Sequence, residues 1–254
     1  MTTGDVCLAL ILPATVGSGL SWCEQALAAD TAAVPRPPRA GPATVFVSHA
    51  WSGNFETIVL SLQGWAHANR PGLAASTYLW FDIFTVRQHG TTGLDFDWWA
   101  EAFAARVAAI GSLALVLDWN DPEPLTRAWC VWEIAAAVEA GADFEVVMSP
   151  ACEETFRDSL LEDFDRVVLK TCTVDIRDAR CGRIPPAPRD HDARARILGA
   201  VENGTGLAKT NAIVVSAMQQ WMASRGRGLI SEPPSPAQAR VVLAVARLLH
   251  GHGD

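Results

Sequence analysis

A carboxylate lies in the middle of a largely apolar helical segment of this chain, which runs from about Leu125 to Ala140. Helical spacing places Glu133 on one face with Trp129, four residues before it, and Cys130, three residues before it, while Trp132 is adjacent. A carboxylate beside two indoles is poorly hydrated unless it lines a cleft, and loss of hydration raises its pKa, as in catalytic carboxylates. Glu133 is therefore a candidate catalytic residue.

Two other interpretations of this segment remain open. Buried glutamates are usually paired, so Glu133 could instead form a structural ion pair with Arg127 or Arg106. A different class of enzyme would use Cys130 as a nucleophile and His49 as its base, although a thiol inside an apolar helix is usually inert packing. The residues alone do not decide among these roles.

Apolar runs separated by turn residues predict strands that alternate with helices. Ser112–Trp119 has the length and composition of a buried parallel strand, Asn120–Pro124 ends it, and Gly141 ends the helix that follows. The other strands are expected at Thr44–Ser48, Thr77–Ile83, Phe144–Met148 and, as the fifth, either Val167–Lys170 or Cys172–Ile176. This alternation predicts an α/β fold with a doubly wound, flavodoxin-like parallel sheet of strand order 2-1-3-4-5 and a C-terminal helical extension.

In such a sheet, a ligand binds in a crevice at the carboxyl ends of the strands. The turn after the first strand, the end of the second strand and the helix after the third strand all meet there. The candidate site residues that these elements carry are Ser48, His49, Trp51, Asp82, Trp129 and Glu133. We therefore expect these six side chains to surround one cleft.

The same segments resemble a known family. Trp129-Cys-Val-Trp-Glu-Ile134 resembles the Trp-Cys-x-x-Glu-Leu motif of Toll/interleukin-1 receptor (TIR) domains, and Val45–His49 resembles the first-strand box of that family. Leu79–Gln88 also resembles the Trp-x-Asp-x-x-Cys-x-Asn-Gln segment of fungal heterokaryon-incompatibility domains, which are themselves TIR-like. The resemblance covers about Thr44 to Val174.

The TIR resemblance implies NAD glycohydrolase activity, in which NAD is the substrate and no cofactor is needed. In the NAD-cleaving members, the glutamate at the position of Glu133 is catalytic. Cleavage expels neutral nicotinamide, so the carboxylate has to stabilise an oxocarbenium-like centre and no acid is needed for the leaving group. Trp129 or Trp51 would stack on the nicotinamide, and Asp82 and Ser48 would hold ribose hydroxyls.

The alternative function is a non-catalytic interaction module, because TIR domains commonly signal by self-assembly.

The chain departs from the family in two places. The basic residue that many NAD-cleaving members carry near the first turn is missing unless His49 substitutes for it, and the loop from Thr85 to Asp97 is long. In the family, a neighbouring subunit orders the equivalent loop, so we expect self-association and activity that rises with protein concentration.

The segments outside the TIR-like region set the predicted domain boundaries. Residues 1–43 are predicted to form an apolar segment, with a helix around Trp22–Ala29, followed by a proline-rich linker. Residues 44–176 are predicted to form the α/β domain, and residues 177–254 a helical extension. Within the extension, helices are expected at Asp190–Val201 and Leu207–Ser224. The stretch from Ala239 to Asp254 resembles the first helix and turn of a tetratricopeptide repeat. One half-repeat cannot bury its own apolar face, so it should either dock on the domain or lead into a longer repeat array. The C-terminal helices could also contact protein partners.

Composition excludes several classes of function. The 254 residues carry a formal net charge of −8 and no basic run, which argues against nucleic-acid binding. The six cysteines show neither Cys-x-x-Cys pairs nor Cys/His metal spacing, so reduced thiols in the cytoplasm and no metal site are expected. The apolar stretch Val6–Leu20 is short and interrupted by Pro13 and Gly17, so no membrane span is expected.

Overall fold

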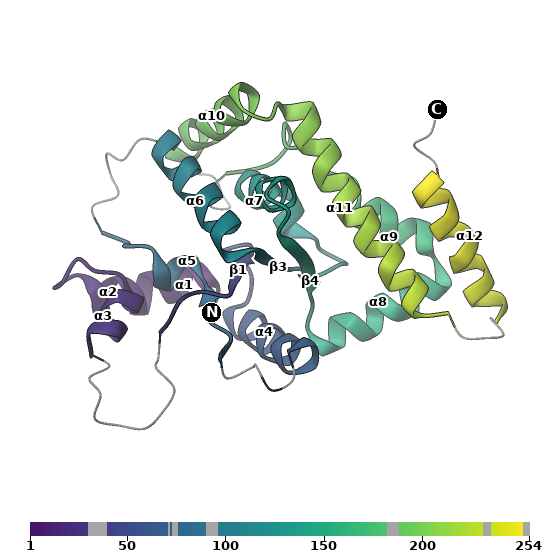
Figure 1. The fold of residues 1–254 in the computed structure, drawn as a ribbon, viewed down its shortest axis with the longest axis horizontal. Helices are drawn as coiled ribbons and strands as arrows, with labels where there is room; N and C mark the ends of the chain where they lie inside the picture. The colour runs from purple at the N-terminus through teal and green to yellow at the C-terminus, as the bar shows by residue number, and fades with distance from the viewer. Residues whose placement is uncertain are drawn as a thin grey trace.

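The structure is a computed structural model of the chain, and it describes residues 1–29, 40–70, 72, 76–89, 96–181, 188–230 and 235–250. A parallel sheet lies at the centre, and helices pack around it (Figure 1). The α/β class predicted from the sequence is therefore confirmed.

The sheet of the described residues has four strands in the order β2-β1-β3-β4. They are β1 (Val45–Ser48), β2 (Leu79–Trp80), β3 (Ser112–Val116) and β4 (Asp143–Val147). Ser48 pairs with Leu115, which in turn pairs with Val146, so the carboxyl ends of these three strands lie along one edge of the sheet. This order agrees with the first four positions of the prediction. The strand β2 is shorter than expected because Asp82 begins a helical turn, α5 (Asp82–Thr85).

The predicted fifth strand is wrong, and the five-stranded order is therefore not confirmed. Its first candidate, Val167–Lys170, lies inside helix α9 (Phe164–Thr171), and the second, Cys172–Ile176, forms bends and turns. Phe164, Val167 and Thr171 are buried at helical spacing, and the Asp163 carboxylate caps the helix by accepting the N–H of Arg166. In the part of the chain that the structure describes, β4 is thus an edge strand.

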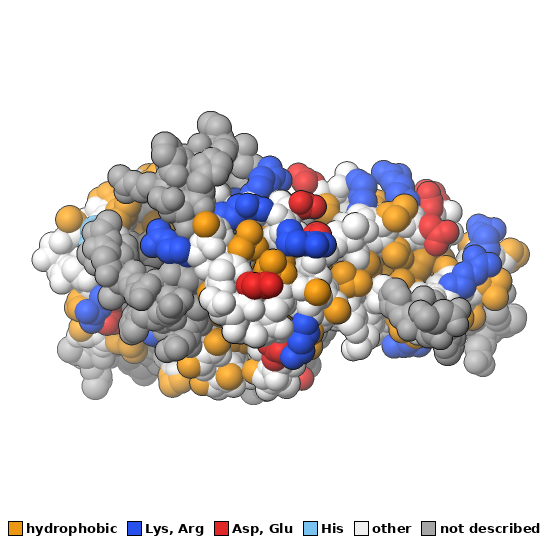
Figure 2. All heavy atoms as spheres, turned by 90° about the horizontal axis from the view of Figure 1, so that it is seen from above, with side chains coloured by type: hydrophobic (Ala, Val, Ile, Leu, Met, Phe, Trp, Pro, Cys, Tyr) orange, Lys and Arg blue, Asp and Glu red, His pale blue; other side chains and the backbone are white. Residues whose placement is uncertain are grey.

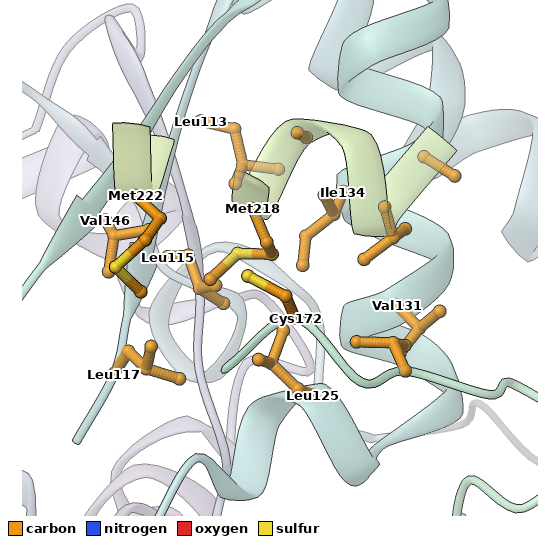
Figure 3. Close-up of a cluster of buried hydrophobic side chains, with 14 of the residues drawn as sticks. Leu113, Leu115, Leu117, Leu125, Val131, Ile134, Val146, Cys172, Met218 and Met222 are labelled. Carbon is orange, nitrogen blue, oxygen red and sulfur yellow. The ribbon is translucent and has the colours of Figure 1, made fainter. Parts of the chain in front are cut away.

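Side chains that alternate along the strands fill two cores, one on each face of the sheet. On one face, Leu113 and Leu115 pack with residues of the helices α7 (Ala128–Glu139) and α11 (Leu207–Gly228). Figure 3 shows them beside Ile134, Met218 and Met222. On the other face, Val45, Val47 and Ala114 pack against helix α4 (Phe55–Asn69) and the N-terminal segment. Helices therefore cover both faces of the sheet, as doubly wound folds require.

The longer helices connect the strands or follow them. They are α4 (Phe55–Asn69), α6 (Phe96–Ile110), α7 (Ala128–Glu139), α8 (Pro150–Glu162), α10 (Pro188–Asn203), α11 (Leu207–Gly228) and α12 (Pro236–His250). Helix α11 packs along α7, and α12 packs against α11, α8 and α9. The last helix therefore docks on the rest of the molecule, which is one of the two arrangements expected for a half-repeat.

The N-terminal residues pack on the α/β unit and run beside the loop after β1. They form α1 (Thr3–Val6), a π-helical turn η1 (Cys7–Ile11), α2 (Leu12–Thr15) and α3 (Trp22–Ala29), the last at the predicted position. The N–H of Thr3 donates to the carbonyl of Gly53, and that of Gly4 donates to the carbonyl of Trp51. Among the described helices, none has both the length and the apolar character that crossing a membrane demands.

Candidate functional site

A cleft of about 600 Å³ lies where the ends of β1 and β2 meet the first half of α7. Its lining residues are Thr2, Gly4, Asp5, Leu8, His49, Trp51, Ser52, Asp82, Phe103, Arg127, Trp129, Cys130 and Glu133. All of the candidate site residues except Ser48 are among them. Three elements that are far apart in the sequence therefore bring these side chains together, in the region where the topology places a ligand.

Glu133 lies at the base of this cleft, on the second turn of α7, and is 9% exposed. The Ser48 hydroxyl, at the end of β1, donates a 2.6 Å hydrogen bond to Glu133 Oε2. Among the described residues, Glu133 forms no ion pair, so neither Arg127 nor Arg106 neutralises it there. Burial raises the pKa of Glu133 to about 8; the Ser48 hydrogen bond opposes this rise and the charge of Asp82 adds to it.

Ser48 itself does not line the cleft. It is 1% exposed, and its hydroxyl is directed at the Glu133 carboxyl. Its place in the structure is therefore that of a residue which orients the carboxylate.

His49, Trp51 and Asp82 form the wall beside Glu133. The Trp51 indole donates a 2.6 Å hydrogen bond from Nε1 to Asp82 Oδ2, while Asp82 Oδ1 lies 4.0 Å from His49 Nε2. Burial lowers the pKa of His49; Asp82 opposes the shift, and the positive charge of Arg127 adds to it. The imidazole is thus neutral at physiological pH.

Aromatic rings also line the cleft. The Trp129 ring lies 5.7 Å from that of Phe103, measured between centroids, and both residues line the cleft. Trp51, 37% exposed, lies at the rim. A planar ring could therefore stack on Trp129 or Trp51 while its substituent approaches Glu133.

The alternative nucleophile, Cys130, is buried, and its thiol donates to the backbone carbonyl of His49 at 3.4 Å. Burial is the largest cause of a strongly raised pKa for this thiol, and the charge of Glu133 adds to it. The thiolate needed for nucleophilic attack is therefore strongly disfavoured, and the cysteine mechanism has no support from the geometry.

Sequence reasoning missed the wall of the cleft that the N-terminal segment supplies. Asp5 and Thr2 form a capping box in which the Thr2 N–H donates to the Asp5 carboxylate and the Thr2 hydroxyl accepts the Asp5 N–H. The Thr-x-x-Asp spacing is visible in the sequence and predicts a helix start, but it does not indicate what the helix packs against. Phe103 and Arg127 were likewise not recognised as lining residues, because their places depend on how α6 and α7 meet the sheet.

Some features fall outside this cleft. In the described part of the chain, no group of three histidine, cysteine, aspartate or glutamate side chains is placed to hold a metal ion. Gly90 and Gly93 of the long loop lie outside the described residues. A larger groove of about 1160 Å³ runs along β4, between α4 and α11, and contains none of the candidate site residues.

The chain was compared with protein-family models, with curated proteins and with solved structures, and none of the three comparisons gave a match.

Proposed function

We propose that this chain is a TIR-like signalling domain whose cleft cleaves NAD into nicotinamide and ADP-ribose, with Glu133 as the catalytic residue. The observation that carries this proposal is a buried carboxyl that opens into a cleft, bonded to a single hydroxyl and flanked by indole rings. A carboxylate in such surroundings is suited to stabilise a developing positive charge, because low-dielectric walls strengthen electrostatic interactions.

The reaction needs one bond to break and one to form. The bond between nicotinamide nitrogen and ribose C1′ breaks, and its electron pair leaves with neutral nicotinamide. Carboxylate Glu133 stabilises the positive charge that remains on the ribose. Water then adds to C1′ and releases a proton, which the carboxylate can accept because its pKa is about 8.

The other residues bind and orient the substrate. Trp129 stacks on the nicotinamide, and Trp51, at the rim of the cleft, is the other indole on which the ring could stack. Asp82 accepts hydrogen bonds from ribose hydroxyls, while Ser48 holds the Glu133 carboxyl. Binding of the cationic nicotinamide riboside group favours the charged form of Glu133, so substrate itself promotes loss of the proton.

A simple assay tests the proposal. Purified chain incubated with NAD should release nicotinamide, measured by chromatography, and Glu133→Gln should reduce that release by about 100-fold or more. Glu139→Gln is the matched control, because Glu139 lies on the same helix but pairs with Lys209 away from the cleft. Equal nicotinamide release by the wild-type and Glu133→Gln proteins would exclude this mechanism.

The non-catalytic assembly module is the second candidate, and the edge strand β4 with its adjacent groove favours it. A sheet edge presents backbone N–H and C=O groups to any chain that packs there. Under either candidate, the proposed partners are other copies of this chain and proteins that contact α10 to α12. We propose no nucleic-acid or membrane partner. The proposed location is the cytoplasm. Absence of nicotinamide release from protein that self-associates would favour this candidate.

A further inference from the structure

Strand β4 has one edge that pairs with no other strand among the described residues. The N–H of Asp143 donates to the carbonyl of Gly111, which directly precedes β3. Because backbone groups alternate in direction along a strand, Phe144 and Val146 direct their N–H and C=O groups away from β3. In the described part of the chain, no residue bonds these groups. They are therefore available to pair with a further strand.

This edge lines the groove of about 1160 Å³ that runs between α4 and α11 (Figure 1). The groove lies beside β4, where the sequence predicted a fifth strand. All residues of β4 (Asp143–Val147) are among its lining residues, and they span roughly 17 Å. The groove therefore has the position and the length for one added strand.

The two walls of this groove differ in polarity. Toward α11, Phe144 belongs to the same apolar cluster as Ile213 and Trp221. Toward α4, the Glu145 carboxylate accepts a hydrogen bond from the Trp65 indole. Because the side chains of a strand alternate between its two faces, an added strand would meet an apolar wall on one face and a polar wall on the other.

The polar wall carries negative charge. The two cations that line the groove, Lys209 and Arg225, each pair with a glutamate. Among the described residues, Asp143 and Glu145 form no ion pair. A second copy of β4 would bring the same carboxylates to this face, and like charges on neighbouring strands are destabilising. A strand with basic side chains on this face has the complementary charge.

We propose that this groove binds an extended segment of another protein as an added strand, in which apolar residues alternate with lysine or arginine. Its backbone pairs with Phe144 and Val146, and its apolar side chains face α11. Its cations approach Asp143 and Glu145. The groove shares no lining residue with the cleft, so this inference does not rest on the proposed catalysis.

Calorimetry with a capped heptapeptide of alternating valine and lysine tests the proposal. The wild-type chain should bind this peptide, and a matched peptide of valine and glutamate should bind at least about tenfold more weakly. Asp143 is exposed, so Asp143→Lys should keep the fold and weaken binding of the lysine peptide by about threefold to tenfold. Glu162→Lys is the matched control, because Glu162 is exposed and lies outside the groove. Its affinity should equal that of the wild type.

Two further measurements distinguish strand pairing from loose ionic attraction. In hydrogen exchange followed by nuclear magnetic resonance, the lysine peptide should slow the amides of Phe144 and Val146 by about tenfold or more. The amide of Glu145 should change little, because it already faces β3. Methylating the backbone nitrogens of either the valines or the lysines should abolish binding, and methylating the other set should not, because only one set faces β4.

Three results would overturn the inference. The first is equal binding of the lysine and glutamate peptides. The second is unchanged exchange at Phe144 and Val146 when the peptide is bound. The third is slow exchange of these two amides that depends on protein concentration without peptide, which would assign the groove to a second copy.

Discussion

A carboxyl group that is buried beside one hydroxyl donor holds its proton more tightly than a carboxyl in water. Glu133 is such a group, and its hydrogen-bond partner Ser48 lies 85 residues earlier in the chain. The hydrogen bond favours the charged form, whereas burial favours the neutral form and is the larger effect. The balance leaves a carboxyl that loses its proton near the pH of the cell.

This ionisation predicts how stability depends on pH. The folded chain raises the pKa of Glu133 from 4.5 to about 8, so between these values the folded state binds the proton more tightly than the unfolded state. The stabilisation from the neutral carboxyl is complete below pH 4.5 and is lost as the pH rises through about 8. Glu133→Gln should therefore increase the free energy of unfolding relative to wild type, by a few kcal/mol at about pH 9 and much less at about pH 5.

Urea unfolding of both proteins at the two pH values measures this difference. Glu145→Gln serves as the control, because the wild-type Glu145 carboxylate lies outside the cleft, where it accepts a hydrogen bond from the Trp65 indole. A stability difference between wild type and Glu133→Gln that does not change with pH would contradict the raised pKa.

At the scale of elements, the N-terminal segment is attached through a few buried side chains. Ile11, 4% exposed, packs in the core with Phe81 and Ile83, whereas its neighbour Leu10 is 56% exposed. We expect Ile11→Ser to lower the free energy of unfolding by about 2–4 kcal/mol and to reduce NAD cleavage, because the wall of the cleft loosens. Leu10→Ser should stay within about 0.5 kcal/mol of wild type.

Thermal unfolding and limited proteolysis of the two variants provide the measurement. Faster cleavage within residues 1–29 of the Ile11→Ser protein is the expected sign of a loosened segment. If both variants resist protease equally and cleave NAD equally, the segment is not needed to complete the cleft.

Helix α12 docks where a glycine allows close approach. A Cβ added at Gly226 of α11 would lie 2.7 Å from Val245 Cγ2, whereas one added at Gly228 would meet nothing within 4 Å. Gly226→Ala should therefore destabilise the protein by about 1–3 kcal/mol, since the helices must separate. Gly228→Ala, measured by the same denaturant titration, should be neutral or slightly stabilising. Equal stability of the two variants would argue against this helix contact.

The elements also show which parts of the fold the sequence could predict. Ser112–Val116 and Val45–Ser48 are apolar runs of strand length between turns, and both form strands. The short apolar run Val167–Leu169 fits a strand or a helix equally well, and only burial against the core selects the helix. The Glu133 motif predicted a buried carboxylate, but the partner hydroxyl and the N-terminal wall arise from tertiary packing, which no local pattern encodes.

At the scale of the whole molecule, surface charge is mixed on the face shown in Figure 2, where basic and acidic side chains alternate with apolar ones. Such a surface does not impose strong repulsion between copies, even though the chain carries a net charge of −8. Self-association at micromolar concentration is therefore compatible with the electrostatics of this face.

The last prediction concerns that assembly. If a second copy completes the site, nicotinamide release should rise more steeply than linearly with protein concentration, because contacts from the neighbour offset the entropy lost when the site becomes ordered. The measurement compares specific activity with sedimentation velocity over one dilution series. Glu133→Gln protein supplies the matched test, since it keeps the shape and the contacting surfaces but lacks the carboxylate. Excess Glu133→Gln added to dilute wild type should restore specific activity, because the variant acts as the neighbour without turning over NAD. Flat specific activity across the dilutions, with no effect of the added variant, would mean that each chain works alone.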